Sequence, residues 1–170
     1  MKNTVLLYGI WSALSIFVLF LISSSLLKGL DFNTQEIYGY ASIVVSLSFV
    51  FFGIKHFRDT KNRGLLSFGK GLLIGLLITL FASITFGIYN VVYVEYIDPN
   101  FMTEYYNHSV EQISKTLSGA ELQAKLKQME DEKDMFANPF VNFSLMFLTV
   151  FMIGLIISLI SSLILQRKQT

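Results

Sequence analysis

The sequence predicts an all-α integral membrane protein, a four-helix bundle with a helical hairpin inserted between spans three and four. Two observations predict this class. Only 15% of the 170 residues are charged, whereas about a quarter are charged in soluble domains. The charges are also segregated, because four stretches contain no Asp, Glu, Lys, Arg or His: 3–27, 37–54, 71–94 and 135–166. Segments that are apolar all round and about 20 residues long are typical of bilayer crossings.

The first two predicted spans cover about residues 4–27 and 37–54. Tyr8 lies near the start of the first span, where amphipathic rings settle at a membrane interface. The second span is the shortest and reaches only about 27 Å as a helix, so we expect it to stand nearly upright. Asn33, followed three residues later by Glu36, resembles a capping box and predicts a helix start there.

A basic loop, residues 55–70, follows the second span. It contains five basic side chains that we single out as candidate contacts for anionic lipid head groups: Lys55, Arg58, Lys61, Arg63 and Lys70. The alternative is purely topological, because Lys and Arg in a short loop hold that loop in the cytoplasm. The sequence does not separate the two interpretations.

The end of this loop also matches part of a phosphate-binding motif, in Gly64, Gly69 and Lys70. The match fails at Gly71, where the motif needs Ser or Thr to hold magnesium. We therefore predict neither nucleotide binding nor any other cofactor.

The third and fourth spans cover about residues 71–94 and 139–165, and Pro139 fits a helix start. Gly71 and Gly75 form a small-xxx-small pair, which predicts close packing against another helix. Asn90 and Asn142 lie at matching depths in the two spans, so we predict that they make interhelix polar contacts, facing the bundle interior or each other. The alternative is that water at the interface hydrates them.

The insert, residues 95–138, is predicted to form a helical hairpin outside the cytoplasm. Asp98 with Pro99 predicts one helix start, and Ser118 with Glu121 predicts another. Between and after them, apolar side chains recur at helical spacing: Met102, Tyr105, Tyr106, Val110, Ile113, Leu117, Leu122, Leu126 and Met129. Three interpretations stay open: a cap on the spans, a partner-binding module, or insertion into the outer leaflet.

The distribution of charge predicts the orientation. With four spans, the termini and the basic loop share one side, which carries eight Lys and Arg and one acid, Asp59. The other side carries five lysines and eleven acids. Because cytoplasmic loops are rich in Lys and Arg, both termini are predicted to be cytoplasmic.

The chemistry that the sequence lacks narrows the function. There are no cysteines, which excludes disulfides and thiolate metal sites. The predicted spans hold no ionisable acid or base, the groups that ion-coupled transporters use. Neither His56 nor His108 has a second ligand at metal spacing. We predict no catalytic residue, no metal site and no nucleic-acid partner.

The segment 51–96 resembles an uncharacterised membrane family, domain of unknown function 4199. The residues that carry the resemblance are Gly53, Ile54, Arg58, Asp59, Ser67, Phe68, Gly69 and Lys70. A departure is Gly71, where the family often has alanine. The resemblance implies a bacterial inner-membrane protein with four spans, and it implies no activity.

The leading functional hypothesis is a non-enzymatic structural or interaction component of the bacterial inner membrane. Its partners would be the lipid bilayer together with a protein, or a second copy of the chain, engaged through the insert or the spans. The alternative is a small-solute transporter or channel subunit that acts as an oligomer.

Overall fold

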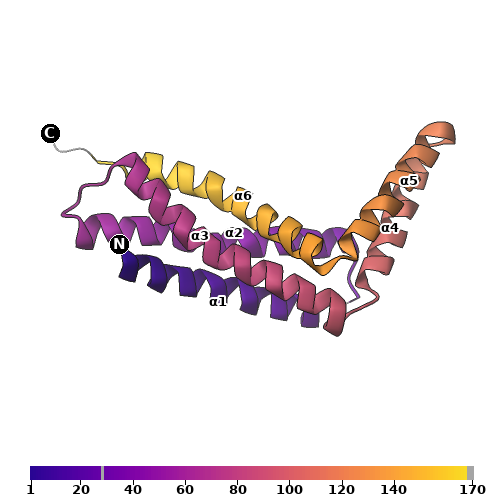
Figure 1. Cartoon of the computed structure of the whole chain (residues 1–170), viewed down its shortest axis with the longest axis horizontal. Coiled ribbons are helices and arrows are strands. Elements are labelled where there is room, and N and C mark those ends of the chain that lie inside the picture. The colour runs from indigo at the N-terminus through magenta and orange to yellow at the C-terminus, as the bar shows by residue number, and fades with distance from the viewer. Residues whose placement is uncertain (28, 168–170) are drawn as a thin grey trace. The chain divides into compact units, whose positions relative to one another are not determined.

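The computed structural model describes residues 1–27 and 29–167, without the side chain of Asp134 (Figure 1). Lys28 and Lys168, which contribute to the charge count of the sequence, lie outside the described residues. Every named element in the described part is a helix, so the predicted all-α class is confirmed. The packing divides the chain into two units, residues 1–86 with 146–170, and residues 87–145.

The first unit begins with α1 (Lys2–Leu26) and α2 (Phe32–His56). Asp31 caps α2, because its carboxylate accepts hydrogen bonds from the Thr34 backbone N–H at 2.8 Å and from the Thr34 hydroxyl at 2.6 Å. The prediction that Asn33 begins this helix is therefore wrong by two residues. Asp31 rather than Asn33 caps α2 because its side chain reaches the backbone N–H of Thr34 in the first turn of the helix.

α2 is 25 residues long, the same length as α1, and it continues as the π-helix η1 (Phe57–Lys61). It is therefore longer than the short helix expected from the sequence. The charge-free run marked only the apolar part of the helix, whereas the backbone stays helical through polar residues at both ends. The next long helix, α3 (Phe68–Val92), is followed by a second π-helix, η2 (Tyr93–Ile97).

The core of the first unit is apolar, with small polar side chains between the helices. Its largest fully buried apolar side chains come from the four long helices and, at Leu66, from the loop before α3: Ile16, Leu47, Val50, Ile54, Leu66, Ile74, Ile78 and Val150. The Ser12 hydroxyl donates to the Ser46 carbonyl at 2.8 Å and ties α1 to α2. The outward faces are also apolar, for example at Trp11, Val45 and Ile156, each more than half exposed. A surface of this kind suits lipid rather than water.

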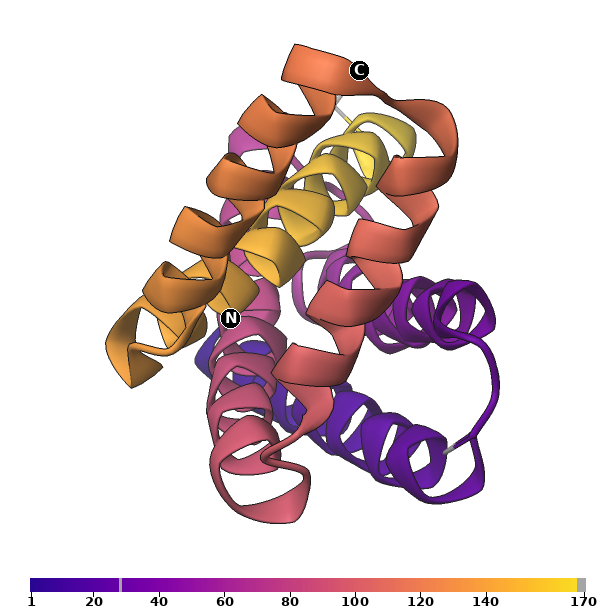
Figure 2. The same ribbon diagram turned by 90° about the vertical axis from the view of Figure 1, so that its right-hand side faces the viewer.

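The second unit contains α4 (Phe101–Thr116), α5 (Gly119–Phe136) and the start of α6 (Pro139–Leu165). Figure 2 shows α4 and α5 side by side as a hairpin. Ser118 occupies the N-cap position as predicted, although its side chain makes no capping hydrogen bond. Asn138 caps α6 by accepting from the Phe140 backbone N–H at 2.9 Å, and Pro139 is the first residue of that helix.

The predicted start of α4 at Asp98 and Pro99 is wrong. The helix begins at Phe101, with Asn100 at the N-cap. The Asp98 backbone takes part in a turn instead, since its N–H donates to the Tyr93 carbonyl at 2.8 Å and its carbonyl accepts from the Phe101 N–H at 3.1 Å. The Asp98 backbone therefore closes η2 rather than opening α4.

In the part of the chain that the structure describes, four helices, including their π-helical extensions, are long and apolar enough to cross a membrane: Lys2–Leu26, Phe32–Lys61, Phe68–Ile97 and Pro139–Leu165. These are the helices of an integral membrane protein. α4 and α5, in contrast, are amphipathic and rich in charge.

Candidate functional site

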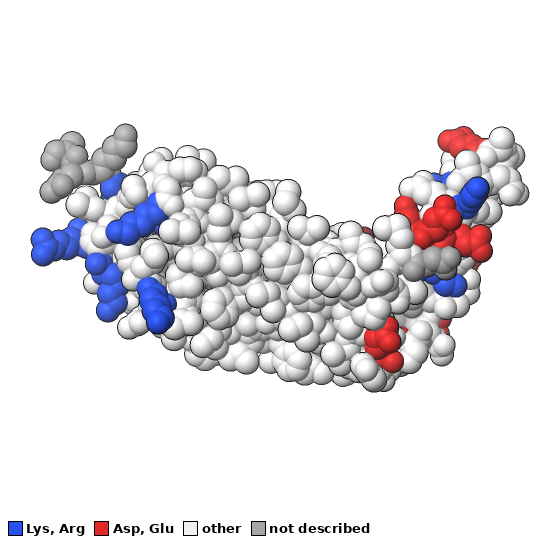
Figure 3. Space-filling model, in the orientation of Figure 1, with Lys and Arg blue, Asp and Glu red and all other residues white. Residues whose placement is uncertain are grey.

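The first unit gathers basic side chains at one of its ends. The Tyr8 and His56 rings contact each other with centroids 5.5 Å apart. Leu66 and Arg167 exchange two backbone hydrogen bonds, at 3.0 and 2.9 Å. These contacts join the start of α1, the end of α2, the start of α3 and the end of α6. Figure 3 shows Lys and Arg side chains gathered over this end of the unit.

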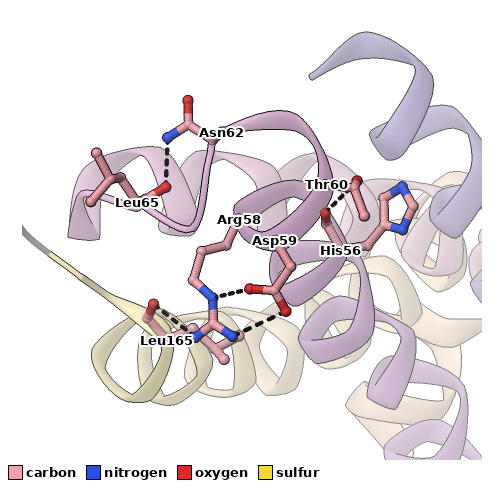
Figure 4. A network of polar contacts seen from close by, with 7 residues as sticks. All are labelled: His56, Arg58, Asp59, Thr60, Asn62, Leu65 and Leu165. Atoms are coloured by element: carbon pink, nitrogen blue, oxygen red, sulfur yellow. Dashed lines mark hydrogen bonds and ion pairs between the residues drawn. The ribbon is translucent and has the colours of Figure 1, made fainter.

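Arg58 lies inside this end and is only 8% exposed. Its guanidinium holds the Asp59 carboxylate through two bonds, Nε to Oδ1 at 2.6 Å and Nη2 to Oδ2 at 3.1 Å. Its Nη1 also donates to the Leu165 carbonyl at 3.4 Å (Figure 4). The last carbonyls of a helix have no partner within the helix and carry partial negative charge. Arg58 therefore closes the end of α6 and neutralises Asp59, the one acid of the basic loop.

The basic loop has a defined backbone. Asn62 Nδ2 donates to the Leu65 carbonyl at 2.6 Å, and the Gly64 N–H donates to the Arg58 carbonyl at 2.8 Å. Arg63 has a φ of 53° and Gly64 a φ of 78°. For a residue with a side chain this left-handed conformation costs about 1–2 kcal/mol. The surrounding hydrogen bonds hold the turn in place against that cost.

The other basic side chains of this end are exposed: Lys55, Lys61, Arg63, Lys70 and Arg167. Among the described residues, none of these five forms an ion pair with an acid. The Lys70 ammonium lies 5.3 Å from the centroid of the Phe57 ring, a cation–π contact. The structure thus separates Arg58, which is buried and paired, from the four other candidates of the sequence analysis, and it adds Arg167.

A seam of small residues joins α3 to α6. A Cβ atom built on Gly71 would lie 2.9 Å from the Ser162 hydroxyl oxygen, and one built on Gly75 would lie 2.6 Å from the Ser158 hydroxyl oxygen. Both distances are too short for a real Cβ. At the two glycines picked out by sequence, α6 therefore lies too close to α3 for a side chain to be added without movement.

The same relation appears with the roles reversed one turn further along. A Cβ on Gly154 of α6 would lie 2.6 Å from the Thr79 hydroxyl oxygen of α3. At Gly71 and Gly75 the serine hydroxyl is the nearest atom, the arrangement in which weak Cα–H···O contacts recur between helices, whereas at Gly154 the Thr79 methyl lies nearer than its hydroxyl. The seam therefore has three contact levels, spaced four residues apart on each helix. The spacing of Gly154, Ser158 and Ser162 is the sequence signal that could have found the half contributed by α6.

The two asparagines differ in environment. Asn142 is 1% exposed, and neither atom of its amide group has a hydrogen-bond partner among the described residues. Asn90 is half-buried. No hydrogen bond joins the two amides, and a buried amide without a partner costs about 1–3 kcal/mol of stability.

The hairpin of α4 and α5 is amphipathic, yet no described side chain in either helix is fully buried. The stripe residues Met102, Tyr106, Ile113, Leu122 and Leu126 are half-buried, and Tyr105 is 41% exposed. Two helices cover each other along only one side, so the apolar stripe stays partly open.

Charged side chains surround that stripe. Lys133 places its ammonium 4.9 Å from the centroid of the Tyr106 ring. Lys115 pairs with Glu111 at 2.8 Å, one turn away on α4, and this hydrogen bond lowers the pKa of the Glu111 carboxyl. Figure 3 shows further acidic side chains over the hairpin. In the described part of the chain, no group of three or more His, Asp and Glu side chains is arranged to hold a metal ion.

Of the comparisons with known proteins, one gives a match. No curated protein matches the chain. No solved structure matches it either. One family model matches residues 7–167, nearly the whole chain, and its description is protein of unknown function DUF4199. The chain therefore belongs to the DUF4199 family, as the resemblance in segment 51–96 indicated.

Proposed function

We propose that this protein is a non-enzymatic interaction component of a bacterial inner membrane, with both termini in the cytoplasm, and that its α4–α5 hairpin docks a protein partner on the outer face. The observation that carries the proposal is the amphipathic hairpin whose stripe stays partly open. An apolar stripe without full cover on a water-exposed element is typical of an interaction surface.

The composition of the stripe supports a protein partner. Tyr105, Tyr106, Met102 and Met129 contribute aromatic and thioether groups, which are enriched at protein interfaces. The acids that flank the stripe would select a partner with a basic rim and would steer its approach. They also disfavour insertion into an anionic leaflet, because interfacial helices usually carry basic polar faces.

The orientation rests on the distribution of charge. The basic end of the first unit carries Lys55, Lys61, Arg63, Lys70 and Arg167, none of which is ion-paired within the described residues, and such loops are retained in the cytoplasm. The hairpin, with its excess of acids, would then face the other side of the membrane.

The test uses the absence of cysteine, which allows a single reactive thiol to be placed at will. A photocrosslinker attached to a Tyr105→Cys variant in native membranes should capture a distinct protein. The matched control is Lys127→Cys, on the exposed polar side of α5, which should capture it much less.

Two outcomes would overturn the proposal. One is equal capture from both positions or none from either. The other is capture of a second copy alone, combined with solute flux through the purified protein in liposomes, which would favour a permeation pathway built by an oligomer.

A further inference from the structure

Three cations converge at the basic end from three different helices. Lys55 belongs to the last turn of α2, Lys70 to the first turn of α3, and Arg167 follows α6. Lys55 lies one helical turn before Arg58, whose guanidinium reaches the Leu165 carbonyl at the end of α6. Arg167 exchanges two backbone hydrogen bonds with Leu66, just before α3. Lys70 lies over Phe57, the residue that precedes Arg58. We call Lys55, Lys70 and Arg167 the basic platform.

The centre of the platform is already neutral. Asp59 is the one acid in the sequence of the loop 55–70, and its carboxylate is held by both Nε and Nη2 of Arg58. The buried Arg58 has its remaining Nη1 turned to the Leu165 carbonyl. Among the described residues, none of the three platform cations forms an ion pair with an acid, so they can act together on an external anion.

Apolar surface begins directly beside each platform residue. Phe52, one turn before Lys55 on the same face of α2, is 51% exposed, and Leu73, one turn after Lys70 on α3, is 48% exposed. Ile164, three residues before Arg167, is 66% exposed. An amphiphile could therefore place an anionic group among the cations and hydrocarbon along the adjoining side chains.

We propose that the basic platform binds the head group of an anionic phospholipid, whose acyl chains lie along the exposed apolar faces of α2, α3 and α6. A free phosphate ion would use the cations alone, so the adjoining apolar surface favours the lipid. The proposal concerns the basic end of the first unit and does not depend on the docking of a protein partner to the hairpin.

Each cation near an anionic head group contributes about a fivefold preference. Loss of all three should therefore reduce selectivity for an anionic over a zwitterionic lipid by well over tenfold. A purely topological role for the same charges predicts no selectivity once the protein has been purified.

The experiment is native mass spectrometry of the full-length protein, purified in mild detergent and mixed with equal amounts of phosphatidylglycerol and phosphatidylcholine. The wild-type protein should retain phosphatidylglycerol. The triple variant Lys55→Gln, Lys70→Gln, Arg167→Gln should lose that preference. A matched control with three lysines of the hairpin replaced, Lys115→Gln, Lys125→Gln and Lys127→Gln, should keep it.

A second measurement keeps the test decisive if the triple variant does not fold. The phosphatidylglycerol preference of the wild-type protein should fall as sodium chloride is raised, because screening weakens the attraction, and inorganic phosphate should not displace the lipid at equal concentration. Equal retention of the two lipids by the wild-type protein would overturn the proposal. So would an equal loss in the hairpin control, or displacement by phosphate alone.

Discussion

Replacement of Gly75 by alanine tests the seam between α3 and α6. The added Cβ would lie 2.6 Å from the hydroxyl oxygen of Ser158, 2.8 Å from its Cβ and 3.1 Å from Val50 Cγ1. Rotation of the hydroxyl could relieve the first contact, but it would break the 2.6 Å hydrogen bond from Ser158 to the Gly154 carbonyl.

The contact with the Ser158 Cβ sets the magnitude. No rotation moves a Cβ, and ordinary contact begins at 3.4 Å, so the two backbones must separate by about 0.6 Å. Overpacking of this kind costs about 1–3 kcal/mol in a close-packed core. We therefore expect Gly75→Ala to lower the free energy of unfolding by that amount.

The assay is unfolding in mixed dodecyl maltoside and sodium dodecyl sulfate micelles, followed by circular dichroism. The matched control is Gly69→Ala, also in α3, where nothing lies within 4 Å of the added atom. It should leave stability unchanged or raise it slightly. In a Ser158→Gly background the cost of Gly75→Ala should fall below about 1 kcal/mol, because the two nearest obstructing atoms are gone and only the Val50 methyl remains close. Equal stability of the two alanine variants, or no rescue by Ser158→Gly, would show that Ser158 does not limit the approach of the two helices.

Three further predictions concern single side chains. Arg58→Gln should lower the free energy of unfolding by about 1–2 kcal/mol, because it loses its bonds to Asp59 and to the end of α6; equal stability of variant and wild type would contradict this. Asn142→Leu should raise the midpoint in the same assay, since both amide atoms are buried without partners; a lower midpoint would show that the amide is satisfied. The pKa of Glu111 is lowered by Lys115, so this pair stabilises α4 above the ordinary glutamate pKa, and that contribution is lost as the pH falls through the lowered value. An NMR titration should find the Glu111 pKa restored in Lys115→Gln, and no change would contradict the assignment.

The helical class and the long helices were predictable from the sequence because they depend on composition. A long run of residues without charges therefore identifies an apolar helix reliably. Helix starts were less predictable, because several polar residues compete for each cap. Asp31 rather than Asn33 begins α2, and Asn100 rather than Asp98 precedes α4. The Asp31 side chain caps α2 directly, whereas α4 begins after Asn100 without a side-chain cap, where the turn from Asp98 to Phe101 ends.

The sequence predicts that the candidate site is basic, but it does not predict which of its side chains form ion pairs or hydrogen bonds with one another. The sequence groups Arg58 with four other basic residues, and nothing local shows that its guanidinium turns inward to Asp59 and the Leu165 carbonyl. That contact joins residues 107 positions apart. Arg167 was missed for the same reason, since its place beside Leu66 depends on how α6 ends against the loop. Gly71 and Gly75 were found because their spacing is local, whereas the Ser158 and Ser162 that meet them lie on another helix.

Single-cysteine labelling tests most directly our proposal that the basic end and the acidic hairpin face opposite sides of a membrane. Ser67 lies in the basic loop and Ser118 lies between α4 and α5, and both are exposed. In intact spheroplasts of a bacterial host, a membrane-impermeant maleimide should label the Ser118→Cys variant. It should label Ser67→Cys only after the membrane has been permeabilised. Labelling of both variants, or of Ser67→Cys alone, before permeabilisation would contradict the account.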